Sequence, residues 1–505
     1  METKTGLCFQ DTKNKKGARI MIKRREFLKI LGLAGASLPI ESFATNTQSH
    51  KGNRPDVLFI SIEDLSPHRM GCYGNTVCKT PNIDRLASKS VRFDLAHCSA
   101  APCNPSRTSL LTGLRPETTR IFGNGDDWTK AVKPGETMTE HFMANGYETI
   151  RVGKIYHAGN RNKIYDDTSR WSRTIKESEG LPAPKNRRRQ LIGPGVEYGK
   201  ERIADRKQGI YKSSGSPFTY GPSGLDDLEE QDGMSATQTI KVLSQKHSKP
   251  LFFAVGFHKP HLPMTAPDKY FAMYPPEKMV LPENPNTYPD GMPKDKSKLS
   301  ERQPHTLTQW REAIAAEYAC VTFVDAQVGR ILDALDKSGR ADNTIIVLWT
   351  DHGFMLGEHF MWRKGPLYDH SALVPLLIKA PGVTVPNSVC KRPVESIDIF
   401  PTLFELCRIP IPEGLEAISM VPLLKDPKRK WKKGALTCQG ENGKSICTEQ
   451  WRYTEYKNAP EKTELFDRKN DPKEFHNLAH EPAHAKTINQ LSQLLNRGWK
   501  ACLPD

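Results

Sequence analysis

The feature that most constrains the fold is a series of short apolar segments separated by longer amphipathic ones. Near-continuous apolar runs span residues 56–62, 148–152, 250–257, 344–349 and 374–379. Runs of this length are typical of strands with both faces covered. Because each face must then pack against other elements, the pattern favours an open sheet sandwiched between helices.

Segments with helical periodicity lie between the apolar runs. They span residues 82–88, 106–112, 139–145, 236–245, 309–337 and 394–406. Strands that alternate with helices in this way predict an α/β fold with a mostly parallel sheet.

The pattern changes after Pro410. Strand-like segments at 448–453 and 463–466 precede a helical one at 487–499, which predicts a smaller C-terminal α+β domain. We therefore divide the chain into a leader (1–44), a main domain (45–425) and a C-terminal domain (426–505). Residues 160–235 and 268–305 are polar and rich in Gly, Pro and Lys, which is typical of loops.

The leader has the pattern of an export signal. Lys23, Arg24 and Arg25 precede an apolar stretch at 30–38, and small residues at Ser42 and Ala44 suit cleavage. The arginine pair is typical of a twin-arginine signal, although a chance basic helix start is the alternative. The apolar stretch is too short for a permanent anchor. We expect a periplasmic or extracellular protein without a stable membrane anchor. Whether residues before Met21 are translated stays open.

The chain is strongly basic, with a formal net charge of +15, and it remains basic at +10 once residues 1–44 are removed. A basic surface favours nucleic acid, anionic lipid or sulfated sugar, but a solvated surface without a partner is equally compatible. The same two readings hold for the basic run at 185–189. No nucleic-acid-binding motif is recognisable, so we expect no nucleic-acid partner.

The chain contains 11 cysteines. Cys438 and Cys447 are close enough in sequence to close a small disulfide loop, and Cys72 and Cys78 are a second candidate pair. Spacing alone does not determine disulfide connectivity.

Four of the apolar runs are followed by side chains capable of chemistry. These are Glu63 and Asp64; Lys154 and His157; His258, Lys259 and His261; and Asp351 and His352. Any one of them alone is more often a helix cap or a structural histidine. Because ligands bind at the carboxyl ends of parallel strands, the whole set predicts one site for a hard cation and an anion.

Residues 103–113 read CNPSRTSLLTG. This segment resembles the signature of the type I, formylglycine-dependent sulfatase family, in which Cys-x-Pro-x-Arg directs oxidation of the cysteine to formylglycine. Segments 80–87, 113–120, 152–157, 254–261 and 351–359, followed by Lys364, are similar to the iduronate-2-sulfatase branch in particular. The stretch 464–478 resembles the family's C-terminal region more loosely.

The resemblance implies an alkaline-phosphatase-like fold and one bound Ca²⁺. Its ligands would be Glu63, Asp64, Asp351, His352 and the modified Cys103, and an oxygen-rich set suits a hard cation. Two positions depart from common family patterns. Glu63 stands where Asp is usual, so its longer side chain could shift the metal. His352 stands where many sulfatases carry Asn, although the iduronate-2-sulfatase branch has His.

The resemblance also implies a mechanism. A hydroxyl of the hydrated aldehyde at position 103 attacks sulfur, and the second hydroxyl later expels sulfate from the covalent intermediate. Arg107 and Lys154 would stabilise the hydrate, with His157 as its hydrogen-bond partner. His258 and Lys364 would contact the sulfate and the leaving oxygen, with His258 as general acid. A formylglycine-generating enzyme is the implied maturation partner.

The sequence therefore predicts hydrolysis of sulfate esters, with a sulfated saccharide as the expected substrate and uronate 2-sulfate as one option. A phosphonate monoester or phosphodiester hydrolase of the same superfamily is one alternative. A non-catalytic binder of sulfated glycans is the other, although such a binder would need no intact nucleophile motif.

Overall fold

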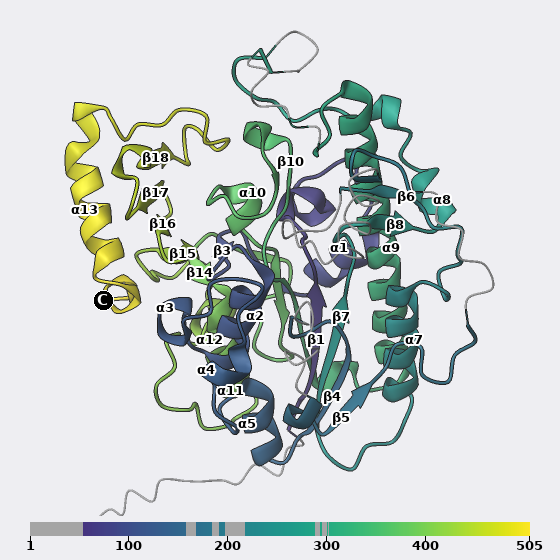
Figure 1. Cartoon of the computed structure of the whole chain (residues 1–505). Coiled ribbons are helices and arrows are strands. Elements are labelled where there is room, and N and C mark those ends of the chain that lie inside the picture. The colour runs from purple at the N-terminus through teal and green to yellow at the C-terminus, as the bar shows by residue number, and fades with distance from the viewer. Residues whose placement is uncertain are drawn as a thin grey trace, which may run out of the picture. The chain divides into compact units, whose positions relative to one another are not determined.

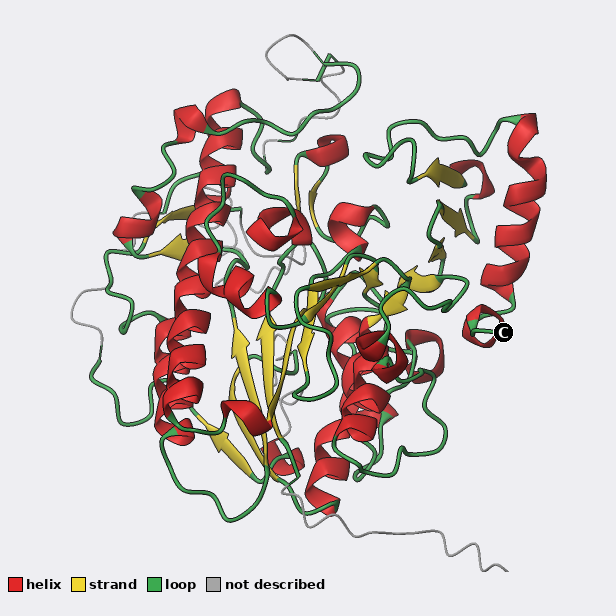
Figure 2. Ribbon diagram, turned by 180° about the vertical axis from the view of Figure 1, so that it is seen from behind, coloured by secondary structure: helices red, strands yellow, loops and turns green. Residues whose placement is uncertain are grey.

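The apolar runs form the centre of one eight-stranded sheet in the computed structural model of the chain, with helices on both faces (Figures 1 and 2). The structure describes residues 54–157, 168–183, 191–196, 218–287, 293–294, 300 and 302–505. The predicted export signal and the basic run at 185–189 lie outside the described residues.

Five adjacent strands of the sheet run parallel to one another. In spatial order they are β9 (Thr344–Thr350), β1 (Asp56–Ile62), β7 (Leu251–Phe257), β4 (Glu148–Gly153) and β5 (Arg173–Ile175). Each of the first four arises from a predicted apolar run, whereas β5 was not predicted.

The other side of the sheet is mixed. Beyond β9 lie β12 (Leu376–Lys379), β2 (Val91–Phe93) and β13 (Ser388–Cys390). Strand β12 is antiparallel to both β9 and β2, while β13 is parallel to β2. The predicted mixed, mostly parallel sheet is therefore confirmed.

The two faces of β1 enter two different cores, since side chains alternate along a strand. Leu58 and Ile60 pack in one core, and Val57 and Phe59 pack in the other. Helices α1 (Pro81–Ala87), α7 (Gln231–Leu243) and α9 (Leu307–Lys337) contribute to the first core; α2 (Cys103–Thr112), α5 (Met138–Ala144) and α11 (Ile399–Leu406) contribute to the second.

The predicted helix at 394–406 begins later than expected. Residues Val394–Glu395 form strand β14, which pairs with β3 (Ala96–His97); a 3₁₀ turn follows at Ser396–Asp398, and α11 starts at Ile399. The Asp398 carboxylate accepts a hydrogen bond from the Glu395 backbone N–H at 3.0 Å and so ends the extended segment. The buried apolar positions alone do not reveal this change of backbone conformation.

A four-stranded antiparallel sheet confirms the smaller C-terminal α+β unit, whose boundary at 425/426 stays a prediction. Its strands are β15 (Ala435–Gln439), β16 (Gly443–Cys447), β17 (Trp451–Tyr456) and β18 (Glu464–Asp467). Helix α13 (Ala485–Asn496) packs Leu491 and Leu495 against this sheet.

Short elements complete the described fold. They are α3 (Pro116–Thr119), α4 (Trp128–Ala131), α8 (Asp268–Phe271), α10 (Asp369–Ala372), α12 (Val421–Lys425), β6 (Tyr220–Pro222), β8 (Met264–Ala266), β10 (Met355–Leu356) and β11 (Trp362–Arg363). Among the residues that the structure describes, no helix has the length and apolar character needed to cross a membrane.

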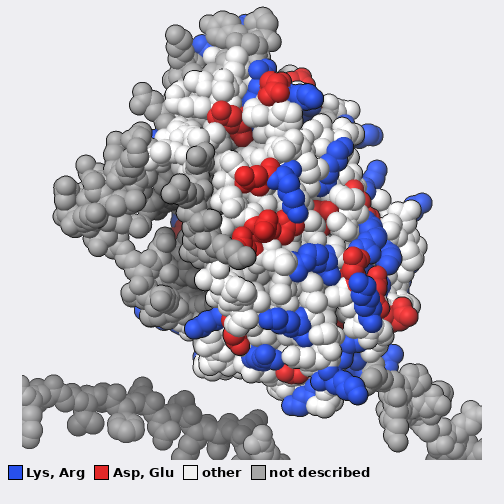
Figure 3. Space-filling model, turned by 90° about the vertical axis from the view of Figure 1, so that its right-hand side faces the viewer, with Lys and Arg blue, Asp and Glu red and all other residues white. Residues whose placement is uncertain are grey.

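Neither candidate disulfide is formed: every cysteine in the described residues is a free thiol. In the β15–β16 ladder Cys438 lies opposite Lys444, and Cys447 lies opposite Ala435, so the two cysteines are out of register. On the described part of the face in Figure 3, Lys and Arg are interspersed with Asp and Glu. The basic charge is thus not gathered into one patch on that face.

Candidate active site

Two acidic strand ends meet at the carboxyl edge of the sheet. Glu63 and Asp64 follow β1, Asp351 and His352 follow β9, and the two strands are parallel neighbours. All four side chains are buried. The Asp64 backbone N–H donates to Asp351 Oδ1 at 3.2 Å. Asp64 has a φ of 56°, a left-handed conformation that Asp tolerates better than most residues.

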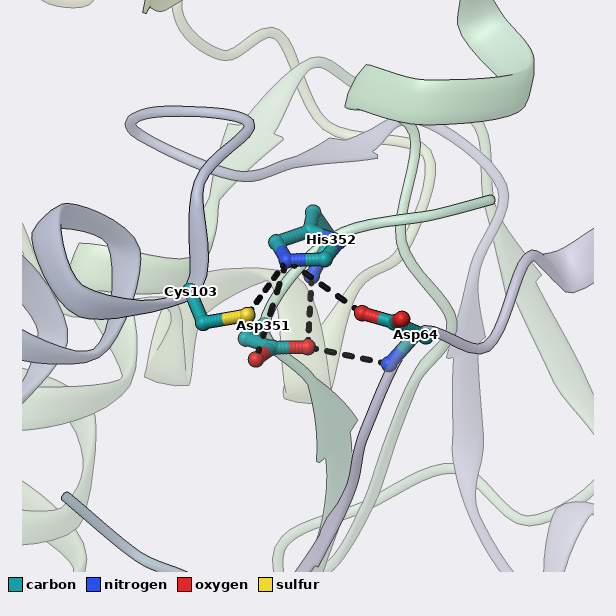
Figure 4. A group of neighbouring side chains, drawn as sticks. All are labelled: Asp64, Cys103, Asp351 and His352. Atoms are coloured by element: carbon teal, nitrogen blue, oxygen red, sulfur yellow. Dashed lines mark hydrogen bonds and ion pairs between the residues drawn. The ribbon is translucent and has the colours of Figure 1, made fainter. Parts of the chain in front are cut away.

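Cys103 is the first residue of α2 and points at these strand ends (Figure 4). Its Sγ lies 3.1 Å from His352 Nε2 and 3.5 Å from Glu63 Oε1. Ser106 of the same helix donates to the Asp351 carbonyl oxygen at 2.6 Å, which fixes α2 against the end of β9. We call Glu63, Asp64, Cys103, Asp351 and His352 the strand-end cluster.

The donor atoms of this cluster fall into two overlapping groups. Asp64, Cys103, Asp351 and His352 each offer one atom within 4.8 Å of the others. Glu63 groups instead with Asp64 and His261. His261 Nε2 lies 3.9 Å from Glu63 Oε1 and 3.8 Å from Asp64 Oδ2. His261 belongs to the strand-end set that predicts the site, but no ligand or catalytic role was predicted for it.

Arg107 is buried directly beneath the cluster. Its Nε donates to Asp351 Oδ2 at 2.8 Å, and Nη1 donates to the Lys154 and Ile155 carbonyls at 3.0 and 2.9 Å. Among the described residues its Nη2 has no hydrogen-bond partner. A buried guanidinium with a donor to spare is suited to an anionic ligand.

Two lysines pair with the remaining carboxylates. Lys154 Nζ contacts Glu63 Oε1, and Lys364 Nζ lies 2.8 Å from both carboxylate oxygens of Asp64. Burial raises the pKa of Glu63, but the charges of Lys154, His261, Arg107 and Lys364 together outweigh it, and the pKa falls well below its usual range. Conversely, burial lowers the pKa of Lys364, but Asp64, Cys103 and Glu63 together raise it more.

A pair of glycines allows β4 to deliver Lys154 to this site. Gly153 and Gly256 lie opposite each other at the ends of β4 and β7. A Cβ on Gly153, which has a φ of +72°, would lie 2.0 Å from the Gly256 carbonyl oxygen. Only residues without a side chain fit this approach.

The two remaining predicted histidines occupy different environments. His157 is largely enclosed: burial, followed by the Lys154 charge, lowers its pKa to about 3, so its imidazole is neutral. His258 is about one-third exposed and contacts Gln231 and Glu177. It lines a cavity of about 150 Å³ together with His261, whose ring contacts Glu63 and Asp64.

The donor set fits a divalent metal. His352 Nδ1 lies 2.9 Å from the Gly353 carbonyl oxygen, which can only accept, so Nδ1 carries the proton. Nε2 is then left as a lone-pair donor facing Cys103 and Asp64. Two carboxylates and this imidazole form a buried cluster that could bind such an ion.

The arrangement defines a class of enzyme. Buried carboxylates, cationic side chains and a residue at a helix N-terminus meet at one edge of an α/β sheet, and this combination is suited to the hydrolysis of anionic esters. The Sulfatase family model matches residues 55–409, and the model for the C-terminal region of N-sulphoglucosamine sulphohydrolase matches 357–500. The chain belongs to the sulfatase family and is a sulfuric ester hydrolase.

Individual relatives agree with this assignment. A sulfatase of Formosa agariphila is 31% identical over 467 residues, covering 89% of this chain and 88% of that protein. Human iduronate 2-sulfatase is 30% identical over 427 residues, covering 76% of this chain and 74% of that protein. The solved structure of a phosphonate monoester hydrolase of Agrobacterium radiobacter matches with a TM-score of 0.69 at 22% identity, covering 89% and 96% of the two chains. That likeness supports the fold alone.

Proposed function

We propose that the enzyme removes sulfate from saccharide sulfate esters, with Cys103 converted to formylglycine and one Ca²⁺ bound by the strand-end cluster. One observation carries the proposal: acidic and imidazole groups from two strand ends lie around the Cys103 sulfur. The saccharide substrate is supported by the likeness to iduronate 2-sulfatase. The basic charge of the chain is compatible with a sulfated ligand.

Calcium is the proposed metal because the available donors are mainly carboxylate oxygens. Glu63, Asp64, Asp351 and His352 would hold it together with the modified residue 103. When bound, the ion would polarise the sulfate group and balance its charge. Lys154 and Lys364, which pair with Glu63 and Asp64, are long enough to turn toward a bound anion instead.

The state of Cys103 supports the need for modification. Burial raises the pKa of its thiol, and the opposing Lys364 charge does not compensate. The residue is therefore a neutral thiol at physiological pH, and a neutral thiol is a poor nucleophile. Formylglycine supplies a hydrated aldehyde whose hydroxyl can attack sulfur. This requirement makes a formylglycine-generating enzyme the proposed maturation partner.

The surrounding residues take separate roles in the proposal. Arg107 directs its free Nη2 and Lys154 its ammonium to the hydrate and the sulfate oxygens. His157, neutral and with a buried Nδ1 that lacks a partner in the described part of the chain, can exchange a hydrogen bond with the hydrate. Lys364 contacts the sulfate, and His258 protonates the leaving oxygen.

A comparison of turnover tests the reaction class. One preparation, with Cys103→Ala as the control for contaminating enzymes, is assayed on 4-nitrophenyl sulfate and on bis(4-nitrophenyl) phosphate. We expect a higher kcat/KM for the sulfate. The opposite order would favour a phosphonate monoester or phosphodiester hydrolase. Binding of sulfated glycans without any turnover would favour a non-catalytic binder.

The substrate and the location need separate experiments. Release of free sulfate from a panel of defined sulfated oligosaccharides would identify the sugar and the sulfate position. We also propose export through the signal in residues 1–44. A Lys-Lys replacement of Arg24 and Arg25 should retain the protein in the cytoplasm, whereas unchanged export would contradict a twin-arginine signal.

A further inference from the structure

The chain from the end of α12 to the start of β15, both labelled in Figure 1, is strongly basic. Residues 425–433 read KDPKRKWKK, so six of these nine residues are Lys or Arg and one is acidic. We call them the α12–β15 basic segment. A run of this density is typical of surfaces that bind polyanions, but a solvated loop can have the same composition. The contacts of the individual side chains decide between the two.

Two side chains anchor the segment to the rest of the fold. Trp431 packs against the second core, to which α2, α5 and α11 contribute. Lys432 is buried, and its ammonium lies 2.7 Å from Glu395 Oε2 and 2.7 Å from both carboxylate oxygens of Asp398. These two residues therefore hold the segment in place and leave its other side chains to the surface.

The backbone of the segment is held as well. Arg392 donates from Nε to the Arg429 carbonyl oxygen at 2.9 Å, and from Nη2 to that of Lys428. Glu449 accepts two hydrogen bonds from Arg392 Nη1, at 2.6 and 2.7 Å, and so fixes this guanidinium. The Asp426 carboxylate accepts from the Lys428 backbone N–H at 3.1 Å. All these contacts to Lys428 and Arg429 use the peptide groups and not the charged side chains.

Five cationic side chains of the segment are exposed. They are Lys425, Lys428, Arg429, Lys430 and Lys433. Lys433 pairs with Asp505 at 2.7 Å. In the part of the chain that the structure describes, the other four have no carboxylate within ion-pair distance. The exposed carboxylates of Asp426 and Asp505 offset only part of this charge. The fold thus presents unpaired positive charge on a fixed backbone.

We propose that the α12–β15 basic segment is a binding surface for a polyanionic sulfated polysaccharide, in addition to the strand-end cluster. A linear polyanion gains free energy when Lys and Arg side chains release its condensed counterions. A backbone that is already fixed loses little conformational entropy on binding. The identity of the polyanion rests on the proposed function, since a polymeric saccharide substrate carries further sulfates beyond the one at the active site.

The side chains of the segment favour a polysaccharide over a lipid surface. Segments that lie on membranes combine basic side chains with exposed apolar ones that enter the lipid. The one aromatic residue of the segment, Trp431, packs against the protein core instead. Lysine ammoniums are point charges on flexible stems, and they can follow sulfates at varied spacing along a chain.

Salt-dependent binding to heparin, used as the probe, tests the surface. Lys428→Gln/Arg429→Gln/Lys430→Gln removes three exposed charges that hold nothing in the fold, so the melting temperature should stay near that of the wild type. At about 0.1 M salt the variant should bind heparin about 10- to 100-fold more weakly. The slope of log Kobs against log salt concentration should become shallower by about 2 to 3. Unchanged heparin binding would overturn the surface and leave the proposed function intact.

A second triple variant controls for net charge. Lys241→Gln/Lys246→Gln/Lys249→Gln removes the same charge from exposed positions at the end of α7 and in the chain before β7. It should weaken heparin binding by less than about threefold. An equal loss in the two triple variants would show that binding follows net charge alone, and would overturn the surface.

Kinetics and lipid binding test the partner. The Lys428/Arg429/Lys430 variant should raise KM for a sulfated polysaccharide by about 10-fold or more, with kcat unchanged and with 4-nitrophenyl sulfate turnover near that of the wild type. Tighter wild-type binding to vesicles of phosphatidylglycerol and phosphatidylcholine than to heparin would overturn the choice of polysaccharide. If the wild type releases sulfate from no saccharide while the variant still loses heparin affinity, the proposed function fails and the polyanion-binding surface stands.

Discussion

Two buried clusters in this molecule combine the same residue types and differ in what they can do. The strand-end cluster contains Asp64, Cys103, Asp351 and His352, and a second group contains His97, Asp369 and Cys447. We call the second group the junction cluster, because it joins α10 and β3 to β16 of the C-terminal sheet. Composition alone does not separate the two clusters.

The two clusters differ in the cationic side chains that pair with their carboxylates. In the junction cluster, Asp369 is bound by Arg452 and by Arg468 at 2.6 Å, and Arg452 also donates to Glu474 at 2.5 Å. These planar, buried guanidinium groups hold the two carboxylates in a fixed geometry.

In the strand-end cluster, Glu63 and Asp64 instead meet lysine ammoniums on flexible side chains. His261, which contacts both carboxylates, also lines a cavity together with His258. The comparison teaches that a reactive site differs from a structural one in two ways: its cationic partners are flexible, and a cavity lies next to it.

A matched pair of cysteine substitutions should give the largest contrast. Cys103→Ala should lower sulfate release by about 10⁴-fold or more, because it removes the nucleophile, while the melting temperature stays near that of the wild type. Cys447→Ala should retain the turnover of each folded molecule. Activity assays with thermal unfolding check both, and loss of activity in Cys447→Ala at unchanged folding would break the distinction.

Removal of metal should affect one cluster only. A calcium chelator should lower activity by more than about 100-fold, and calcium at 100 times its Kd should restore it and stabilise the fold by about 3 kcal/mol. Asp64→Asn should abolish this calcium-dependent rise in melting temperature. Asp369→Asn should keep the rise, although its baseline stability is lower. Scanning calorimetry with and without calcium measures both, and a lost response in Asp369→Asn would contradict the assignment.

Removal of one cation from each cluster should separate stability from activity. Arg452→Met removes the guanidinium that pairs with Glu474 and leaves Asp369 with Arg468 alone, so it should cost about 3–5 kcal/mol of unfolding free energy. Lys364→Met should cost less stability when calcium neutralises Asp64, but should strongly reduce kcat. Denaturant unfolding and steady-state kinetics provide the two readings. A larger loss of stability in Lys364→Met and a larger loss of kcat in Arg452→Met would show that the two clusters have exchanged roles.

The junction cluster should also have a pH signature. Burial raises the pKa of Cys447, but the charges of Arg468, His97 and Arg452 lower it to about 7. Because the folded-state pKa lies below the ordinary value of 9.0, the thiolate contributes stability that is full above pH 9 and is lost as pH falls through 7. Relative to Cys447→Ala, wild-type stability should rise by about 3 kcal/mol across this window. If the stabilities of the wild type and of Cys447→Ala change with pH in parallel, Cys447 is not a thiolate in the folded protein.

The central strands could be predicted from the sequence because burial on both faces leaves continuous apolar runs, as in β1, β7 and β9. Strands β15 and β16 could not be predicted in this way. Polar residues such as Thr437 and Lys444 alternate with apolar ones in them, so few apolar positions follow one another. The short β2 and β5 are defined by pairing with neighbours rather than by their own composition.

The candidate site could be predicted where its reactive side chains directly follow strands. Asp64 and Asp351 converge because β1 and β9 are parallel neighbours. The contacts of His261 and the pairing of Lys364 with Asp64 depend on how loops fold back, and local sequence does not determine these paths.

The most direct test of the account compares the chemical state of residue 103 with activity. Preparations made with varying amounts of a formylglycine-generating enzyme are analysed by peptide mass spectrometry and assayed for sulfate release. The account predicts that specific activity rises in proportion to the formylglycine fraction and vanishes when residue 103 is entirely cysteine. Full activity in a preparation that contains only cysteine at this position would contradict it.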